Sequence, residues 1–162
     1  MKNQKGFSLI ELLIVVAIIL IIAAIAIPNL LRSRIAANET SAVGSLRTVN
    51  TAEITYQSTY PNVGYTCVFA FLGPGAGVVS STSAGLIDAN LSSQNKSGYH
   101  FQTVGVGSCP VSNGLQVGYQ FGAQPQSPGQ TGQRYFCTDQ SAVISFDAST
   151  GLANCAASGT PM

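Results

Sequence analysis

The stretch Lys5-Gly6-Phe7-Ser8-Leu9-Ile10-Glu11 leads directly into an unbroken apolar run over residues 12–27. Between residues 7 and 31, Glu11 is the only charged residue. A helix over these residues would reach roughly 37 Å, which exceeds the hydrocarbon core of about 30 Å of a bilayer. The start of the chain therefore predicts a helix that is long enough and apolar enough to span a membrane.

Two ordinary interpretations of such a segment are open. It could be a cleavable secretory signal, with Lys2 and Lys5 as the basic region and residues 24–26 (Ala-Ile-Ala) as a small-residue cleavage site. It could also be a permanent single-pass anchor. The flanking charges do not decide the orientation, because Lys2 and Lys5 on one side face Arg32 and Arg34 on the other.

Glu11 is the residue that distinguishes these interpretations. An acidic side chain in the middle of a membrane helix costs about 2.5–3.5 kcal/mol on insertion scales, so such a residue is by default a functional candidate. Neither a secretory signal nor a simple anchor gains anything from this cost. The carboxylate therefore indicates that the helix has a further task.

The combination of Gly6, Phe7, Glu11 and Pro28, followed by Asn29-Leu30-Leu31, resembles the N-terminus of type IV pilins and type II secretion pseudopilins. The resemblance implies that a prepilin peptidase removes residues 1–6 after Gly6 and that the new amine of Phe7 is methylated. Glu11 would then pair with that amine in its own chain or in a neighbouring subunit. A paired carboxylate and amine are far cheaper to bury than either charge alone.

The resemblance also implies that the apolar helix over residues 7–31 is retained. It would hold the subunit in the inner membrane and later pack in the filament core. Pro28 lacks an N–H and clashes with the carbonyl of Ala24, but the helical pattern resumes after it, so we expect a kink or local unwinding there. Leu20 departs from the family pattern, which often has a glycine at this position, and leaves open how readily the helix unwinds.

An amphipathic extension of the helix is predicted over residues 32–60. Apolar side chains recur at steps of three and four residues: Ile35, Ala42, Val43, Leu46, Val49, Tyr56 and Tyr60. The pattern assigns polar side chains to the other faces: Arg34, Asn38, Glu39, Arg47 and Glu53. Pro61 ends the helix. The globular remainder, residues 61–162, must cover the apolar stripe.

The remainder is predicted to consist of strands and loops. Four strands are expected, over residues 99–104, 115–121, 134–138 and 142–146. Asp139-Gln140-Ser141 suits a hairpin between the last two, residues 62–97 form a long connection, and residues 122–133 have the composition of an exposed loop. The predicted fold is α+β, with the long N-terminal helix packed on a single antiparallel sheet of about four strands, as in type IV pilins.

The four cysteines, Cys67, Cys109, Cys137 and Cys155, lack the close paired spacing of a zinc site. An exported domain meets oxidising conditions, so disulfides are expected, and the spacing alone leaves all three connectivities open. The resemblance implies Cys137–Cys155, because pilins close a loop near the C-terminus with a disulfide. Cys67–Cys109 would then be the second bridge.

The sequence offers little for catalysis, metal binding or nucleic-acid binding. His100 is the only histidine, and no nucleophile–base pair or paired carboxylates can be assembled, so we expect no enzyme and no cofactor. Asp139 and Asp147 lie where some pseudopilins bind calcium, but two isolated aspartates do not make a site, and no metal is expected. From Arg32 onward there are five basic and five acidic residues, so no basic patch for nucleic acid is expected.

Composition and resemblance together predict a filament subunit. Only 8% of the residues are charged and the net charge is +1, which suits close packing of identical copies. The first expectation is a type IV pilus subunit; the alternative is a type II secretion pseudopilin, and a third is a DNA-uptake pilin. The expected partners are identical subunits, the inner membrane, the prepilin peptidase and the assembly machinery. The expected location is the bacterial inner membrane before assembly and a cell-surface filament afterwards.

Overall fold

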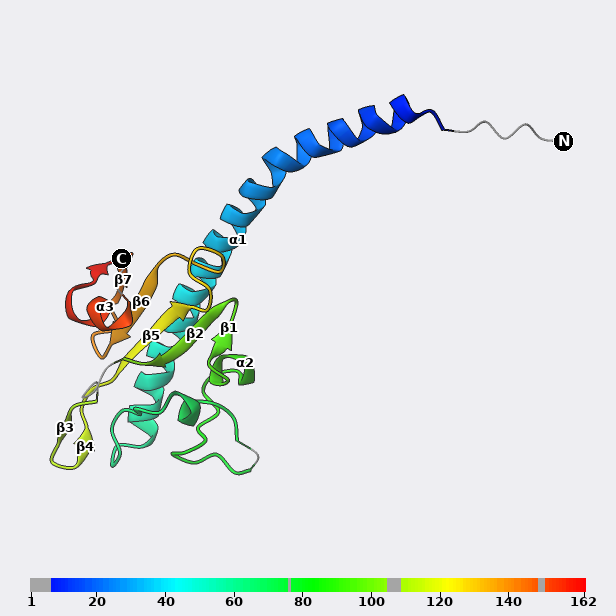
Figure 1. The fold of residues 1–162 in the computed structure, drawn as a ribbon. Helices are drawn as coiled ribbons and strands as arrows, with labels where there is room; N and C mark the ends of the chain where they lie inside the picture. Colours follow the sequence, from blue (N-terminus) through cyan, green and yellow to red (C-terminus); the bar gives the residue numbers. More distant parts are fainter. Residues whose placement is uncertain (1–6, 76, 105–108, 149–150) are drawn as a thin grey trace. The chain divides into compact units, whose positions relative to one another are not determined.

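The computed structural model describes residues 7–75, 77–104, 109–148 and 151–162 (Figure 1). Gly6 and the rest of the expected leader lie outside the described residues. The chain divides into two compact units, Met1–Arg34 and Ile35–Met162. The long helix α1, Leu9–Thr59, contributes its first part to one unit and its second part to the other.

From Leu9 onward the described residues of the first unit are helical. Its apolar side chains, which lie between Phe7 and Leu31, are exposed within the unit. An 18-residue window of α1 has a mean hydropathy of 3.3, so the helix is long and apolar enough to cross a membrane. Pro28 lies inside α1 and does not end it, as the resumption of the helical pattern predicted.

In the second unit the apolar stripe of α1 faces the core. Ala42, Val43, Leu46, Val49 and Tyr56 are buried, and Leu46 and Val49 are fully covered. Ile35 and Tyr60, at the two ends of the predicted stripe, are partly buried. The three-and-four spacing therefore identified the packed face of the helix correctly.

Three polar residues assigned to the other faces do not lie there. Glu39 and Glu53 are buried, and Asn38 is half-buried, whereas Arg34 and Arg47 are exposed as expected. The expectation was wrong for the two glutamates. Glu39 is buried because it accepts hydrogen bonds from the globular part of the chain and pairs with Arg134, and paired acidic groups can be buried. Glu53 is buried with one hydrogen bond, from the N–H of Thr66.

The outward face of α1 carries a row of exposed threonines. Their hydroxyl groups donate to the backbone carbonyl four residues earlier, at 2.8–3.1 Å, in Thr40, Thr48, Thr51, Thr55 and Thr59. This local bonding is a known alternative for threonine within helices. The hydroxyl protons on this face are therefore already engaged by the helix itself.

The second unit contains a six-stranded antiparallel sheet in the order β1-β2-β5-β6-β7-β8. Its strands are β1 (Asn95–Lys96), β2 (Tyr99–Thr103), β5 (Gln120–Pro125), β6 (Tyr135–Asp139), β7 (Ile144–Asp147) and β8 (Thr160–Pro161). The central strands β2, β6 and β7 correspond to predicted strands, β5 overlaps its predicted strand only at residues 120–121, and two-residue strands extend the sheet at both edges. In Figure 1 the sheet lies along the second part of α1. The predicted α+β architecture is confirmed.

The alternating stretch over residues 115–121 is not a single strand. Leu115–Gln116 forms β4, which pairs with β3 (Val111–Ser112) in a separate two-stranded sheet. The chain then leaves β4, and β5 begins only at Gln120 and runs on to Pro125. The predicted exposed loop at 122–133 is therefore wrong at its start, where Gly122, Ala123 and Pro125 are buried.

Short helices complete the second unit. The long connection before β1 contains the 3-10 turn η1 (Phe69–Leu72) and the helix α2 (Ala89–Ser92), which bury Phe69, Leu72 and Leu91. A third helix, α3 (Leu152–Ser158), was not predicted and packs on β6 and β7. The core between sheet and α1 is aromatic, with Phe69 and Phe121 meeting edge to face at 5.2 Å.

Candidate assembly site

The first turn of α1 positions Glu11. Ser8 immediately precedes the helix, and its carbonyl accepts the first helical hydrogen bond, from Leu12 N–H at 3.2 Å. The carboxylate of Glu11 reaches back and accepts from the backbone N–H of Ser8, at 2.8 Å. Ser8 and Glu11 thus have the spacing and half of the bonding of a capping box.

This capping contact was missed in the sequence, although Ser-x-x-Glu before an apolar run is a recognisable signal. It gives Glu11 a structural role in addition to the assembly role that the resemblance implies. A carboxylate in the first turn also interacts favourably with the positive end of the helix dipole. Glu11 is therefore held near the backbone nitrogen of Ser8, the residue that follows Phe7.

The apolar surface around this turn is extensive and uncovered within the unit. Phe7 is 78% exposed, and the large apolar side chains that follow it on every side of the helix are exposed as well. A helix that is apolar all round is stable only when lipid or other apolar helices surround it. The three expected assembly residues, Phe7, Glu11 and Pro28, belong to this first unit.

In the second unit, buried polar groups fasten α1 to the globular part. Glu39 Oε1 accepts from the backbone N–H groups of Gln133 and Arg134, at 2.9 and 3.3 Å. Glu39 Oε2 accepts from Arg134 Nε at 2.8 Å and pairs with Nη2 at 2.7 Å. The guanidinium carbon of Arg134 also lies 5.5 Å from the ring centroid of Phe136 and 5.4 Å from that of Phe146.

Asn50, which lies closer to the C-terminal end of α1 than Glu39, makes a second attachment. Its Oδ1 accepts from the hydroxyls of Thr138 and Tyr119, at 2.9 and 3.1 Å, and its Nδ2 donates to the carbonyl of Ala142 at 3.1 Å. One amide thus joins the helix to β6, to the chain before β5 and to the β6–β7 turn. Burial raises the pKa of Tyr119, so this hydroxyl remains a neutral donor.

The four cysteines form two disulfides, Cys67–Cys109 and Cys137–Cys155, each with a Cα–Cα distance of 5.9 Å. This agrees with the pairing that the resemblance implied. Cys137–Cys155 joins β6 to α3, and Cys67–Cys109 joins the chain after α1 to the chain before β3. Both bridges lie in the second unit.

Of the two aspartates considered for calcium, Asp139 has another role in the structure. Asp139 Oδ1 accepts from the N–H and the hydroxyl of Ser141, which fixes the β6–β7 turn. Among the described residues no group of three or more His, Cys, Asp or Glu side chains could hold a metal ion. His100 Nδ1 lies 3.1 Å from Asn95 Oδ1 in the β1–β2 hairpin, where it is a structural residue.

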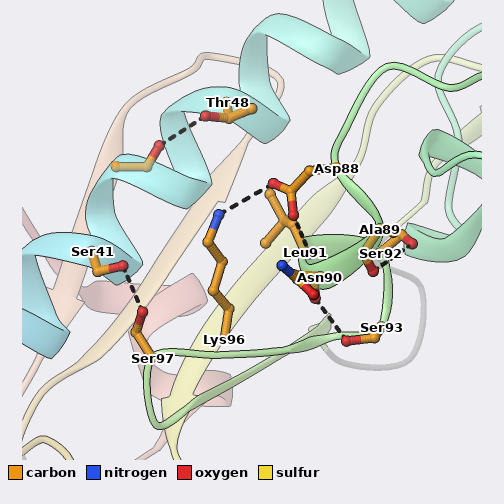
Figure 2. Close-up of polar contacts among 11 residues, drawn as sticks. Ser41, Thr48, Asp88, Ala89, Asn90, Leu91, Ser92, Ser93, Lys96 and Ser97 are labelled. Carbon is orange, nitrogen blue, oxygen red and sulfur yellow. Dashed lines mark hydrogen bonds and ion pairs between the residues drawn. The ribbon is translucent and has the colours of Figure 1, made fainter.

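A polar cluster around α2 is shown in Figure 2. Asp88 caps α2 by accepting from Leu91 N–H at 2.9 Å and pairs with Lys96 at 3.2 Å. The N–H of Leu91, and more weakly the ammonium of Lys96, lower the pKa of Asp88. Ser41 donates to Ser97 at 2.9 Å, which ties this region to α1. These contacts position the connection and assemble no reactive groups.

Comparison with known families identifies the class of the N-terminal segment. Residues 1–27 match the model of the prokaryotic N-terminal methylation motif. The first residues of the chain are therefore a methylation motif of the kind found in prokaryotic prepilins, as the sequence predicted. In this chain the motif continues into α1 of an α+β protein.

Curated relatives resemble part of the chain. The type IV wide pilus major component PilA4 of Thermus thermophilus is 68% identical over 40 residues, 25% of this chain and 30% of the relative. The type IV major pilin protein PilA of Myxococcus xanthus is 46% identical over 56 residues, 35% and 26% of the two chains. A fimbrial protein of Pseudomonas aeruginosa is 54% identical over 52 residues, 32% and 34%.

The aligned part is short in every case. The chain spans between 26% and 34% of the length of these relatives. The likeness extends over 40–56 residues, 25–35% of this chain. What these relatives assemble into is therefore a basis for a proposal about this chain.

Proposed function

We propose that this chain is the structural subunit of a type IV pilus filament, a homopolymer that assembles through α1 after removal of residues 1–6. The observation that carries the proposal is the methylation motif at residues 1–27, placed directly on an exposed apolar helix with one carboxylate in its first turn. The names of the three relatives, all pilus or fimbrial proteins, support it.

The proposed mechanism follows from the solvation needs of α1. Its exposed apolar side chains require lipid before assembly and equivalent helices afterwards, and these two environments are similarly apolar. Transfer between them is then decided by packing and by polar groups. The only carboxylate of the segment, Glu11, would pair with the methylated amine of Phe7 in the neighbouring subunit or in its own, which favours one stagger between subunits.

The partners follow from the same scheme. A prepilin peptidase would cut after Gly6, and the inner membrane and the assembly machinery would hold and move the subunit. The globular second unit would face its neighbours through a surface with few charges, because only 8% of the residues are charged. Low charge reduces repulsion between identical copies.

Mass spectrometry of filaments purified from the cell surface tests the proposal. We expect a mature chain that begins at methylated Phe7. A chain that begins at Met1 or at Ile27 would contradict the proposal. Recovery of the processed chain only in the cell envelope, together with loss of protein secretion on deletion, would favour a secretion pseudopilin instead.

Substitutions of Glu11 test its role, and the structure shows how to separate charge from capping. Glu11→Gln keeps a carbonyl oxygen that can accept from Ser8 N–H and removes the negative charge. Glu11→Ala removes both. We expect both variants to insert in the membrane and to lose surface filaments; normal filament abundance for Glu11→Gln would show that the charge is not needed.

A further inference from the structure

Glu53 is an acidic side chain in an apolar interior, and the proposed assembly function gives it no task. It lies on α1 in the second unit and is 0% exposed. Its Oε2 accepts from the backbone N–H of Thr66 at 3.0 Å. Its Oε1 has no hydrogen-bond partner among the residues that the structure describes. A buried carboxylate with one oxygen unpaired is costly when charged.

The groups around Glu53 do not supply a compensating charge. The titratable side chains that face it are Tyr56 on the same helix and Tyr119 from the chain before β5. Tyr60 and Tyr65 stack on these two rings, at 4.9 and 5.2 Å between centroids. The ion pairs found in the described part of the chain, Lys96–Asp88 and Arg134–Glu39, do not involve Glu53.

Burial therefore raises the pKa of Glu53 to about 8, and the N–H of Thr66 offsets only part of this rise. At neutral pH the group is protonated. It can then keep its contact with Thr66 without the cost of a buried charge. The pKa rises because burial destabilises the whole ionised carboxylate, whereas only one hydrogen-bond donor stabilises it.

Thr66 belongs to a segment, residues 60–67, that closes over the C-terminal part of α1. Tyr65 N–H donates to Gln116 carbonyl and Gln116 N–H donates to Val63 carbonyl, both at 3.0 Å, so β4 holds this segment by two backbone bonds. At the end of the segment, Cys67 is tied to Cys109, and its carbonyl accepts from the hydroxyl of Thr103 on β2 at 2.9 Å. Residue 67 is therefore anchored to the main sheet, and residues 63–66 are the part that can open.

A surface pocket of about 500 Å³ borders the same segment. Its lining includes Pro61, Gly64 and Tyr65 from the segment, Ile54 and Gln57 from α1, and residues of β4. Glu53 does not line this pocket, whereas Gly64 and Tyr65, close to its hydrogen-bond partner Thr66, do. Displacement of residues 63–66 would therefore hydrate the carboxylate.

We propose that Glu53 is a proton-dependent latch: when protonated it lets residues 60–67 close over α1, and when ionised it opens residues 63–66 towards the neighbouring pocket. The opening is local, because the disulfide at Cys67 and the sheet remain in place. In acidic and neutral solution the latch is closed. Opening becomes progressively easier as the pH rises from 4.5 to about 8, because the open form releases the proton that the closed form holds.

The test uses the full-length chain in neutral detergent micelles, labelled with ¹³C at the side-chain carboxyl of glutamate. The chain has three glutamates, Glu11, Glu39 and Glu53, so the spectrum is simple, and the Glu53→Gln variant assigns the signal. We expect the Glu53 signal to titrate near pH 8. A midpoint near the ordinary value of 4.5 would overturn the proposal even if no variant folds.

Amide hydrogen exchange tests the opening itself. After correction for base-catalysed intrinsic exchange, protection at Tyr65 and Thr66 should fall by about tenfold per pH unit between pH 4.5 and pH 8 and level off above, because opening releases a proton only where the closed form holds one and the open form does not. In Glu53→Gln the protection should not depend on pH over the same window. Equal loss of protection in both proteins would refute the latch.

Asp88→Asn is the matched control. It also removes one carboxylate, at an exposed position, and asparagine is an equally good helix cap for α2. This variant should retain the full pH dependence at Tyr65 and Thr66. If it abolished that dependence, general charge effects and not Glu53 would control the segment.

Discussion

Replacing Arg134 by alanine should destabilise the globular unit by leaving Glu39 as a buried charge without its cation. The side chain of Glu39 is 9% exposed and that of Arg134 is 39% exposed. Removal of one partner from a buried pair typically costs about 3–5 kcal/mol. Here the cost is reduced, because the N–H groups of Gln133 and Arg134 still donate to Glu39 Oε1.

The guanidinium contacts with Phe136 and Phe146 add to the loss. Each such contact contributes about 0.5–1 kcal/mol at a partly exposed site. Together we expect Arg134→Ala to lower the free energy of unfolding by about 3 kcal/mol. Arg134→Lys keeps the charge but not the planar fork, so it should recover only part of this loss.

Chemical denaturation of the full-length chain in detergent, with disulfides intact, measures the effect. The chain has no tryptophan, so near-ultraviolet circular dichroism of its tyrosines is the suitable signal. The double variant Glu39→Gln/Arg134→Ala completes a mutant cycle, for which we expect a coupling of about 2 kcal/mol. A loss below about 0.5 kcal/mol for Arg134→Ala would mean that the pair behaves as a solvated surface pair and that the reasoning is wrong.

Two further outcomes are expected. The pKa of Glu53 is about 8 in the folded chain, against the ordinary value of 4.5, so the folded state binds the extra proton between these values. The stability from this group is therefore full below pH 4.5 and falls as the pH rises towards 8. Unfolding titrations should show a loss of about 3–5 kcal/mol across this window, and Glu53→Gln should abolish it. An unchanged slope in Glu53→Gln would exclude Glu53 as its source. The double variant Cys137→Ser/Cys155→Ser removes the second disulfide, whose cysteines are separated by 18 residues in the sequence. It should lower the free energy of unfolding by about 3 kcal/mol in the chain-entropy model and leave membrane insertion unchanged. A measured loss near zero would indicate that packing of α3 alone holds the C-terminal segment.

The helix and its packed stripe could be predicted because local periodicity determines them. Leu46 and Val49 carry the helical period, and their burial requires no knowledge of the partner. The burial of Glu39 could not be predicted in this way, because its partner Arg134 lies in a distant segment. Charged residues are assigned to the surface unless such a partner is known.

The errors in the sheet have a similar cause. The alternation over residues 115–121 has the strand period, but Val117 N–H donates to Pro110 carbonyl and Gly118 packs beside Gln140, so the chain leaves the strand path. Gly122 was assigned to an exposed loop because of its composition. A Cβ there would lie 2.6 Å from Leu152 Cδ2 and 2.8 Å from Val104 Cγ2, so glycine is needed for close packing.

The capping role of Glu11 was missed although the sequence carries its signal, and the assembly role came from resemblance. Ser8 and Glu11 have the capping spacing, and the structure shows the contact. Pairing of Glu11 with the amine of Phe7 involves a processed chain and a second copy. It therefore depends on partners that a single sequence does not contain.

The threonine row on α1 has a consequence for hydration. A surface rich in threonine would ordinarily hold water through its hydroxyl groups, and removing that water would leave unpaired donors. On this face each hydroxyl of Thr48, Thr51 and Thr55 donates to the helix backbone, and the rest of each side chain is a methyl group. Although threonine is a polar residue, this face needs little hydration, because its hydroxyl donors are already bonded. Water can therefore be removed from it without leaving any of these hydroxyl protons unpaired.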